Sequence, residues 1–170
     1  MALSKIPNYL QDLIDSDAIG SSAITAAKIG SLPSGSVIQV VQTSSSADES
    51  TTSTSFVDSG LIVSITPSST SSKILVSYYT SVRKAPGNTN NAVFIQLLRD
   101  STVITAQDYV AWNQLSQYGQ EGVSVCHLDS PSTTSQITYK VQFRTNNASY
   151  SVGFAHDTSE HGIVLMEIAG

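Results

Sequence analysis

Gly122 to Thr145 read GVSVCHLDSPSTTSQITYKVQFRT, and this stretch indicates most directly how the chain folds. From Ile137 to Phe143 apolar and polar residues alternate strictly, as in a strand with one buried and one solvated face. Val123 to Leu128 predicts a shorter strand, and the polar segment between the two contains Pro131, which suits a turn. The stretch therefore predicts a β-hairpin with a polar tip.

Further segments rich in Val, Ile, Thr and Tyr follow one another along the chain, separated by turn signals such as Ala85–Asn91 and Asp100–Ser101. The Ser/Thr-rich residues 44–55 are expected to form an exposed loop. The other predicted strands are residues 37–43, 61–66, 73–82, 93–99, 102–106, 149–155 and 162–168. About eight or nine strands at this spacing predict an all-β, antiparallel, jelly-roll-like sandwich.

Charge and hydropathy exclude several classes of partner. The net charge is −5 and only eight residues are basic, without clustering, which argues against a nucleic-acid partner. No apolar run is long enough to cross a bilayer, and the N-terminus lacks the apolar core of a signal peptide. The single cysteine, Cys126, excludes an intrachain disulfide and is expected to be a buried small side chain.

The chain divides into an N-terminal segment, residues 1–32, and a β-rich domain, residues 33–170. Apolar residues recur at helical spacing near the start, which predicts a short helix that must dock on another protein; a frayed tail is the alternative. The predicted docking residues are Ile6, Tyr9, Leu10, Leu13 and Ile14.

Isolated isoleucines at Ile19, Ile24 and Ile29 follow among small residues. Such a segment cannot build a core of its own, but its isoleucines can meet those of identical chains around an axis; a flexible linker is the alternative. Strands 93–99 and 162–168 are apolar on both faces, which indicates a neighbouring subunit. Ile163 and Leu165 complete the predicted core of the oligomer, whose order these residues leave open.

Several segments resemble known phage proteins in the same order along the chain. Ala23–Ile29 is similar to shaft units of phage tail fibres, and residues 32–170 resemble small C-terminal domains in tail fibres of marine and cyanobacterial phages. The matching segments are residues 33–41, 64–76, 98–101, 128–135, 138–142 and 165–170. The resemblance implies a homotrimer within the virion, anchored to a tail or baseplate protein by its N-terminus. The short segment before residue 33 favours a short fibre, spike or cap.

The segments that match nothing, residues 82–91 and 109–121, are candidates for a recognition surface. Aromatic rings can cover the apolar face of a sugar while amides bond its hydroxyls, so a host-surface polysaccharide is the expected ligand. The predicted receptor-binding residues are Tyr109, Trp112, Tyr118, Asn88 and Asn90. The alternative is that the aromatic rings fill the core or a subunit interface.

No pattern in the chain predicts catalysis, a metal or a cofactor. The serines lie in turns without a G-x-S-x-G motif, and Asp108 and Glu121 are more simply solvated loop acids than a carboxylate pair. His156, Asp157, Glu160 and His161 do not have the spacing of a known metal site. We therefore expect a short trimeric tail fibre; a decoration or adaptor protein without a receptor role is the alternative, and a glycan-degrading enzyme the third.

Overall fold

The computed structural model describes residues 32–86, 91–108, 110–111, 118–155 and 160–170. The chain separates into two compact units after Pro33, and the fold described here is that of the second unit, Ser34–Gly170. All regular elements in the described residues are β-strands, so the predicted all-β class is confirmed. No helix in this part of the chain is long and apolar enough to cross a membrane.

The described residues form ten strands, of which β8 alternates apolar and polar residues most strictly. They are β1 (Val37–Ser45), β2 (Glu49–Thr51), β3 (Val57–Ile65), β4 (Lys73–Lys84), β5 (Val93–Arg99), β6 (Thr102–Gln107), β7 (Gly119–Asp129), β8 (Ile137–Thr145), β9 (Val152–Phe154) and β10 (His161–Ile168).

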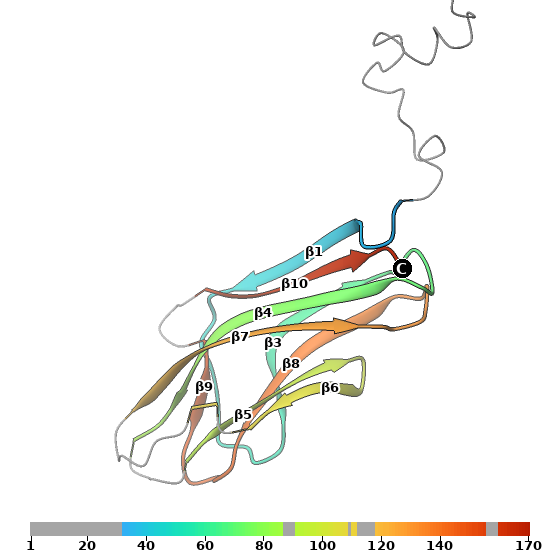
Figure 1. The fold of residues 1–170 in the computed structure, drawn as a ribbon. Helices are drawn as coiled ribbons and strands as arrows, with labels where there is room; N and C mark the ends of the chain where they lie inside the picture. Colours follow the sequence, from blue (N-terminus) through green and yellow to red (C-terminus); the bar gives the residue numbers. More distant parts are fainter. Residues whose placement is uncertain (1–31, 87–90, 109, 112–117, 156–159) are drawn as a thin grey trace, which may run out of the picture. The chain divides into compact units, whose positions relative to one another are not determined.

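The strands form two antiparallel sheets packed face to face (Figure 1). Sheet A contains β1, β10, β4 and β7 side by side, with the short strands β9 and β2 continuing beside the end of β4. Sheet B has the order β3-β8-β5-β6. Without the three-residue strands β2 and β9, numbering along the chain gives the orders 1-8-3-6 and 2-7-4-5. This is the double Greek key of a jelly roll.

The predicted hairpin between residues 122 and 145 is wrong, although both of its strands exist. β7 pairs with β4 in sheet A, whereas β8 pairs with β3 and β5 in sheet B. The polar segment from Ser130 to Gln136 therefore crosses from one sheet to the other. Alternation along a strand determines which face is buried, but it does not determine the neighbouring strand.

The second predicted hairpin is confirmed. β5 and β6 are antiparallel neighbours with Arg99 opposite Thr102 and a β-bulge between Leu97 and Leu98, and Asp100 has a φ of 53° in the turn between them. Asp and Asn tolerate this left-handed conformation better than most residues because their short side chains can bond the local backbone. The loop predicted over residues 44–55 contains one short strand, β2, which pairs with β9.

The core lies between the two sheets and is formed by the inward residues of both. Sheet B contributes the alternating residues identified in the sequence, from Ile137 to Phe143, each at most 5% exposed. Sheet A contributes Ile74, Val76, Tyr78, Ile163 and Leu165, and the rings of Phe143 and Phe154 lie 5.4 Å apart. Burial of these apolar side chains is the main force that holds the sheets together.

Burial within the single chain corrects three sequence-based expectations. Ile163 and Leu165, assigned to a core between subunits, are fully buried in the sandwich of one chain and have no surface to offer to another. Phe94 and Leu98, on the outer face of β5, are each only 6% exposed, so this face needs no neighbouring subunit. Cys126 is exposed, because Val123 and Val125 are the inward residues of its strand.

A buried polar cluster joins the sheets where the chain leaves β7. Both carboxylate oxygens of Asp129 accept hydrogen bonds from the Arg99 guanidinium, at 2.8 and 2.7 Å, and the Tyr139 hydroxyl donates to one of them at 2.7 Å. Burial and this hydrogen bond to Asp129 raise the pKa of Tyr139. Asp129 belongs to sheet A and its two partners to sheet B, so the cluster fixes one sheet on the other.

A second buried carboxylate, Glu167, holds the end of β10. Gln39 donates to it at 2.6 Å, and the backbone and hydroxyl of Ser68 each donate at 2.7 Å. Burial alone would raise the pKa of Glu167, but these hydrogen bonds to the ionised form lower it to about 2. The carboxylate therefore ties β1 and the loop after β3 to β10.

Candidate recognition cleft

A cleft of about 440 Å³ opens between the end of β6 and the first half of β7. β6 is an edge strand of sheet B, and β7 pairs only with β4 in sheet A, so the cleft lies at the open side of the sandwich. Its described lining residues are Gln107, Asp108, Val110, Gly122, Val123 and Ser124. We call this the recognition cleft.

Backbone hydrogen bonds fix the wall of the cleft that follows β6. Gln107 is paired with Ile95, the Val110 amide donates to the Val93 carbonyl at 2.9 Å, and the Val93 amide donates to the Ala111 carbonyl at 3.4 Å. Ala111 is fully buried. The segment is thus attached to β5 at both ends, and the side chains of residues 107 and 108 are presented from a supported backbone.

Polar groups dominate this wall. The Gln107 side-chain oxygen is buried and accepts no hydrogen bond from the part of the chain that the structure describes. A buried acceptor without a donor is costly, and in folded proteins such groups are normally satisfied by protein or water. The Asp108 carboxylate and the Ser124 hydroxyl, which are exposed at the cleft, are the acceptors that a polyhydroxylated ligand could reach.

The opposite wall, on β7, includes a glycine that leaves space. A Cβ placed on Gly122 would have no other atom within 4 Å. Gly122 is therefore an exposed position at the rim of the cleft, where a Cβ meets open space. This property makes Gly122 a suitable position at which to test the cleft.

The structure places few of the predicted site residues. Of the predicted receptor-binding residues, Tyr118 is described: it is 66% exposed, directly before β7, beside a small hollow shared with Arg83 and Ser151. Tyr109, Trp112, Asn88 and Asn90 lie outside the described residues, although the neighbours of Tyr109 in the chain line the cleft. Also outside them are Ile6, Tyr9, Leu10, Leu13, Ile14, Ile19, Ile24 and Ile29.

Sequence reasoning missed Gln107, Gly122 and Ser124 as residues of the cleft. Gln107 follows the predicted strand 102–106, and the other two lie within the predicted hairpin, where they read as ordinary strand residues. The only available signal was their position beside the irregular segment 107–121. They come together because β6 and β7 lie in different sheets, which local pattern does not reveal.

Groups considered for catalysis or metal binding are not assembled in the described residues. Asp108 lines the cleft, but Glu121 is exposed and does not line it. His161 is 1% exposed, with its ring edge-on to Phe154 at 5.7 Å, and Glu160 accepts a hydrogen bond from Tyr79 at 3.3 Å. A search of the described residues finds no group of three metal-ligating side chains.

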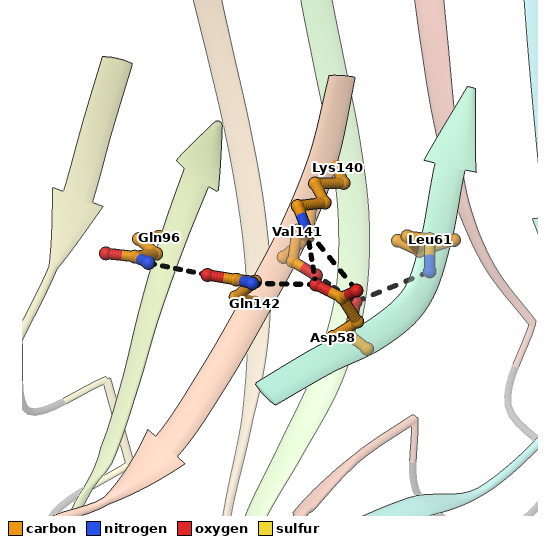
Figure 2. A network of polar contacts seen from close by, with 7 residues as sticks. Asp58, Leu61, Gln96, Lys140, Val141 and Gln142 are labelled. Atoms are coloured by element: carbon orange, nitrogen blue, oxygen red, sulfur yellow. Dashed lines mark hydrogen bonds and ion pairs between the residues drawn. The ribbon is translucent and has the colours of Figure 1, made fainter. Parts of the chain in front are cut away.

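A second polar cluster lies on the outer face of sheet B (Figure 2). The Gln96 amide donates to Gln142 at 2.7 Å, Gln142 donates to Asp58 at 2.7 Å, and Lys140 forms an ion pair with Asp58 at 2.9 Å. Hydrogen bonds from Gln142 and Lys140 lower the pKa of Asp58. These side chains form hydrogen bonds and an ion pair with one another across three strands. The cluster therefore stabilises the register of the sheet and is not a candidate binding site.

Comparison with known proteins adds little to this geometry. No known family model matches the chain, and no curated protein matches it. Among solved structures, a Stig cyclase, Fisc, from Fischerella sp. TAU is 15% identical over 64% of this chain and 54% of its own, with a TM-score of 0.34.

Two structures of infectious bursal disease virus proteins are also similar. That of the Gt strain is 12% identical over 79% of this chain and 39% of its own, with a TM-score of 0.35. That of the VP2 subviral particle is 11% identical over the same shares, with a TM-score of 0.34. The chain thus spans little more than half the length of the cyclase and less than half that of the viral proteins, and the similarity carries no functional argument.

Proposed function

We propose that this protein is a virion structural protein, a short trimeric phage tail fibre whose jelly roll forms a knob that binds a host-surface glycan. The N-terminal residues 1–32 attach it to a tail or baseplate protein, and it acts by binding rather than by catalysis. The resemblance of residues 32–170 to fibre domains motivates the assignment, and a jelly-roll fold is compatible with it.

The observation that carries the binding role is the recognition cleft. It presents the carboxylate of Asp108 and the hydroxyl of Ser124, and sugar hydroxyls are the donors that such acceptors fit. It also adjoins the segment that contains Tyr109, Trp112 and Tyr118, which are the predicted stacking residues. Asp108 at its wall favours a neutral glycan over an anionic one, because like charges repel.

The test is binding of the purified full chain to a panel of immobilised neutral and acidic surface polysaccharides from cyanobacteria and marine bacteria. Gly122→Leu should place a bulky side chain at the β7 rim of the cleft and lower the affinity for any neutral polysaccharide bound by at least about tenfold. Its melting temperature should be unchanged, because the added side chain meets open space. Ile62→Leu, on an exposed strand position of sheet B, is the matched control and should bind normally.

Retention of full affinity in Gly122→Leu would show that the cleft is not the binding site. Absence of binding to every polysaccharide, with the protein still present in the virion, would favour the decoration or adaptor role. The docking proposal has its own test. Deleting residues 2–20 should prevent incorporation into particles while the jelly roll remains folded, and incorporation of the truncated chain would contradict it.

A further inference from the structure

A small hollow beside the start of β7 differs in chemistry from the recognition cleft. Its volume is about 60 Å³, and its described lining residues are Arg83, Ala85, Tyr118, Ser151 and Gly153. This volume corresponds to roughly two water molecules of the liquid, so the hollow admits a group the size of a carboxylate but not a whole sugar ring. Tyr118 is 66% exposed, so its ring is free to contact a sugar that lies outside the hollow. We call this the Arg83 hollow.

The guanidinium of Arg83 supplies the positive charge of the hollow. Arg83 alternates along β4 with the buried Val82 and Lys84, so it points to the outer face of sheet A. Gly153 lies opposite Arg83 on β9, and a Cβ placed there would be 2.7 Å from the Arg83 Nε. The glycine therefore leaves the space in which the Arg83 side chain lies over the backbone of β9.

Arg83 has hydrogen-bonding capacity left for another molecule. Within the described ranges its side chain contacts one acid, Asp48, through Nη2 at 3.4 Å, and it is 28% exposed. This distance is longer than the roughly 2.7–2.9 Å of a strong charge-assisted hydrogen bond. A guanidinium presents several N–H groups in one plane, so it can bind a second carboxylate while it keeps the first.

The Arg83 hollow and the recognition cleft lie along the same strand. Gly122 and Ser124 of the cleft are exposed positions of β7, as is Gln120, which lies opposite Arg83. Tyr118 continues this alternation directly before the strand. From Gly122 to Tyr118 an extended chain advances roughly 13 Å, at about 3.3 Å per residue. A short oligosaccharide lying along β7 therefore reaches from the cleft to the hollow.

We infer that the Arg83 hollow binds the carboxylate of a uronic acid, in a glycan whose neutral sugars occupy the recognition cleft; this inference rests on the glycan-binding role proposed above. Arg83 pairs with the carboxylate, and the exposed ring of Tyr118 stacks on the sugar. Asp108 disfavours an anion in the cleft, so the two sites bind sugars of different charge. The whole chain has a net charge of −5, so attraction to an acidic glycan must come from this local contact.

The test is binding of the purified full chain to hyaluronate, gellan and rhamnogalacturonan, which combine neutral sugars with uronic acids, and to the same polymers after reduction of their carboxylates to alcohols. The wild type should bind at least one acidic polymer about tenfold or more tightly than its reduced form. Arg83→Gln should abolish this preference and leave binding of the reduced form unchanged. Lys140→Gln is the matched control: it also removes a positive charge from an ion pair with an aspartate, at 2.9 Å, and should keep the wild-type preference.

A second variant tests the aromatic part of the site. Tyr118→Ala should lower the affinity for the acidic polymer by at least about threefold, because the stacking contact is lost. Tyr118→Phe keeps the ring and should bind more tightly than Tyr118→Ala. Dextran sulfate separates a carboxylate from other anions: binding to it that depends on Arg83 as strongly would show that the hollow recognises negative charge alone. Circular dichroism and the melting temperature of each variant check that the jelly roll is intact.

The outcomes separate this inference from the proposed function. Equal affinity of the wild type for each acidic polymer and its reduced form, or a preference that survives Arg83→Gln, overturns the inference and leaves glycan binding by the cleft standing. A preference that depends on Arg83, together with unchanged binding by Gly122→Leu, supports the hollow and overturns the cleft. Absence of binding to every polysaccharide, acidic or neutral, overturns both the inference and the proposed receptor role.

Discussion

The two sheets of this protein contribute to the same core but differ in the side chains on their outer faces. On sheet B, Gln96, Gln142, Asp58 and Lys140 form a chain of contacts at 2.7–2.9 Å, and the outward Phe94 is covered by Arg144, whose guanidinium carbon lies 4.0 Å from the ring centre. On sheet A, Val40, Met166, Leu75 and Leu128 form an aliphatic row across four strands, with Val40 and Leu128 53% and 50% exposed, and polar residues of β4 such as Lys73, Ser77 and Arg83 flank it.

This difference shows that an apolar residue on an outer face indicates contact with another molecule only when other side chains of the same chain leave it exposed. Phe94 and Leu98 are apolar outward residues that their own neighbours bury almost completely. Val40 and Leu128 are left half exposed. Sheet B also leaves an apolar residue exposed, since Ile62 is 54% exposed, but on sheet A the apolar residues form a row across four strands.

The largest effect is expected from a variant that removes the polar cluster joining the two sheets. Asp129→Asn should destabilise the fold by about 3 kcal/mol, because the Arg99 guanidinium loses its charged partner and the Tyr139 hydroxyl loses a charge-assisted hydrogen bond in a buried site. Urea unfolding of the full chain measures this. A loss below about 1 kcal/mol would mean that the cluster does not hold the sheets together.

The next largest effect concerns Glu167, the buried carboxylate at the end of β10. The folded-state pKa of Glu167 is about 2, below its ordinary value of 4.5, so its stabilisation is complete above pH 4.5 and is lost as the pH falls towards 2. Over that range the wild type should lose about 2–3 kcal/mol that a Glu167→Gln variant does not lose. Urea unfolding at several pH values checks this, and parallel curves for the two proteins would contradict it.

Local pattern predicted the parts of this fold that depend on one strand at a time. The alternation from Ile137 to Phe143 identified a buried face, and the Asp100–Ser101 turn identified a hairpin, because both are properties of neighbouring residues. The partner of β7 is β4, and the paired residues are distant in the chain, from Lys84 opposite Gly119 to Ile74 opposite Asp129. Nothing local distinguishes a hairpin from a crossover to the other sheet, which is why the crossover was missed.

The same limit applies to the surfaces. The two-sided apolar pattern of β5 and β10 is visible in the sequence, but whether the second face is covered depends on side chains from other strands, such as Arg144 above Phe94. The recognition cleft is similar: its walls come from β6 and β7, which lie in different sheets. Sequence pointed to residues 107–121 as irregular, but not to Gly122 or Ser124.

A smaller effect is expected from uncovering the aromatic ring on sheet B. Arg144→Ala removes the guanidinium from above Phe94 and from Phe56, 5.1 Å away, and should destabilise the fold by about 1 kcal/mol. Arg144→Lys should recover part of this loss, because the lysine stem still covers the ring. Thermal unfolding compares the variants, and equal stability of all three would show that the cover is unimportant. The newly exposed Phe94 would also make the face of sheet B resemble that of sheet A.

The smallest effect is expected at the exposed ion pair between Asp58 and Lys140. Asp58→Asn keeps the shape of the side chain and the hydrogen bond from Gln142 but removes the ion pair with Lys140, and the Asp58 side chain is 61% exposed. An exposed pair of this kind contributes less than about 1 kcal/mol, and salt screens it. The variant should therefore differ little from the wild type in urea and not at all in oligomeric mass. Asp58→Asn makes the same chemical change as Asp129→Asn, but at an exposed site. If it lowers the free energy of unfolding as much as Asp129→Asn does, the ion pair on the outer face of sheet B contributes as much to stability as the buried cluster.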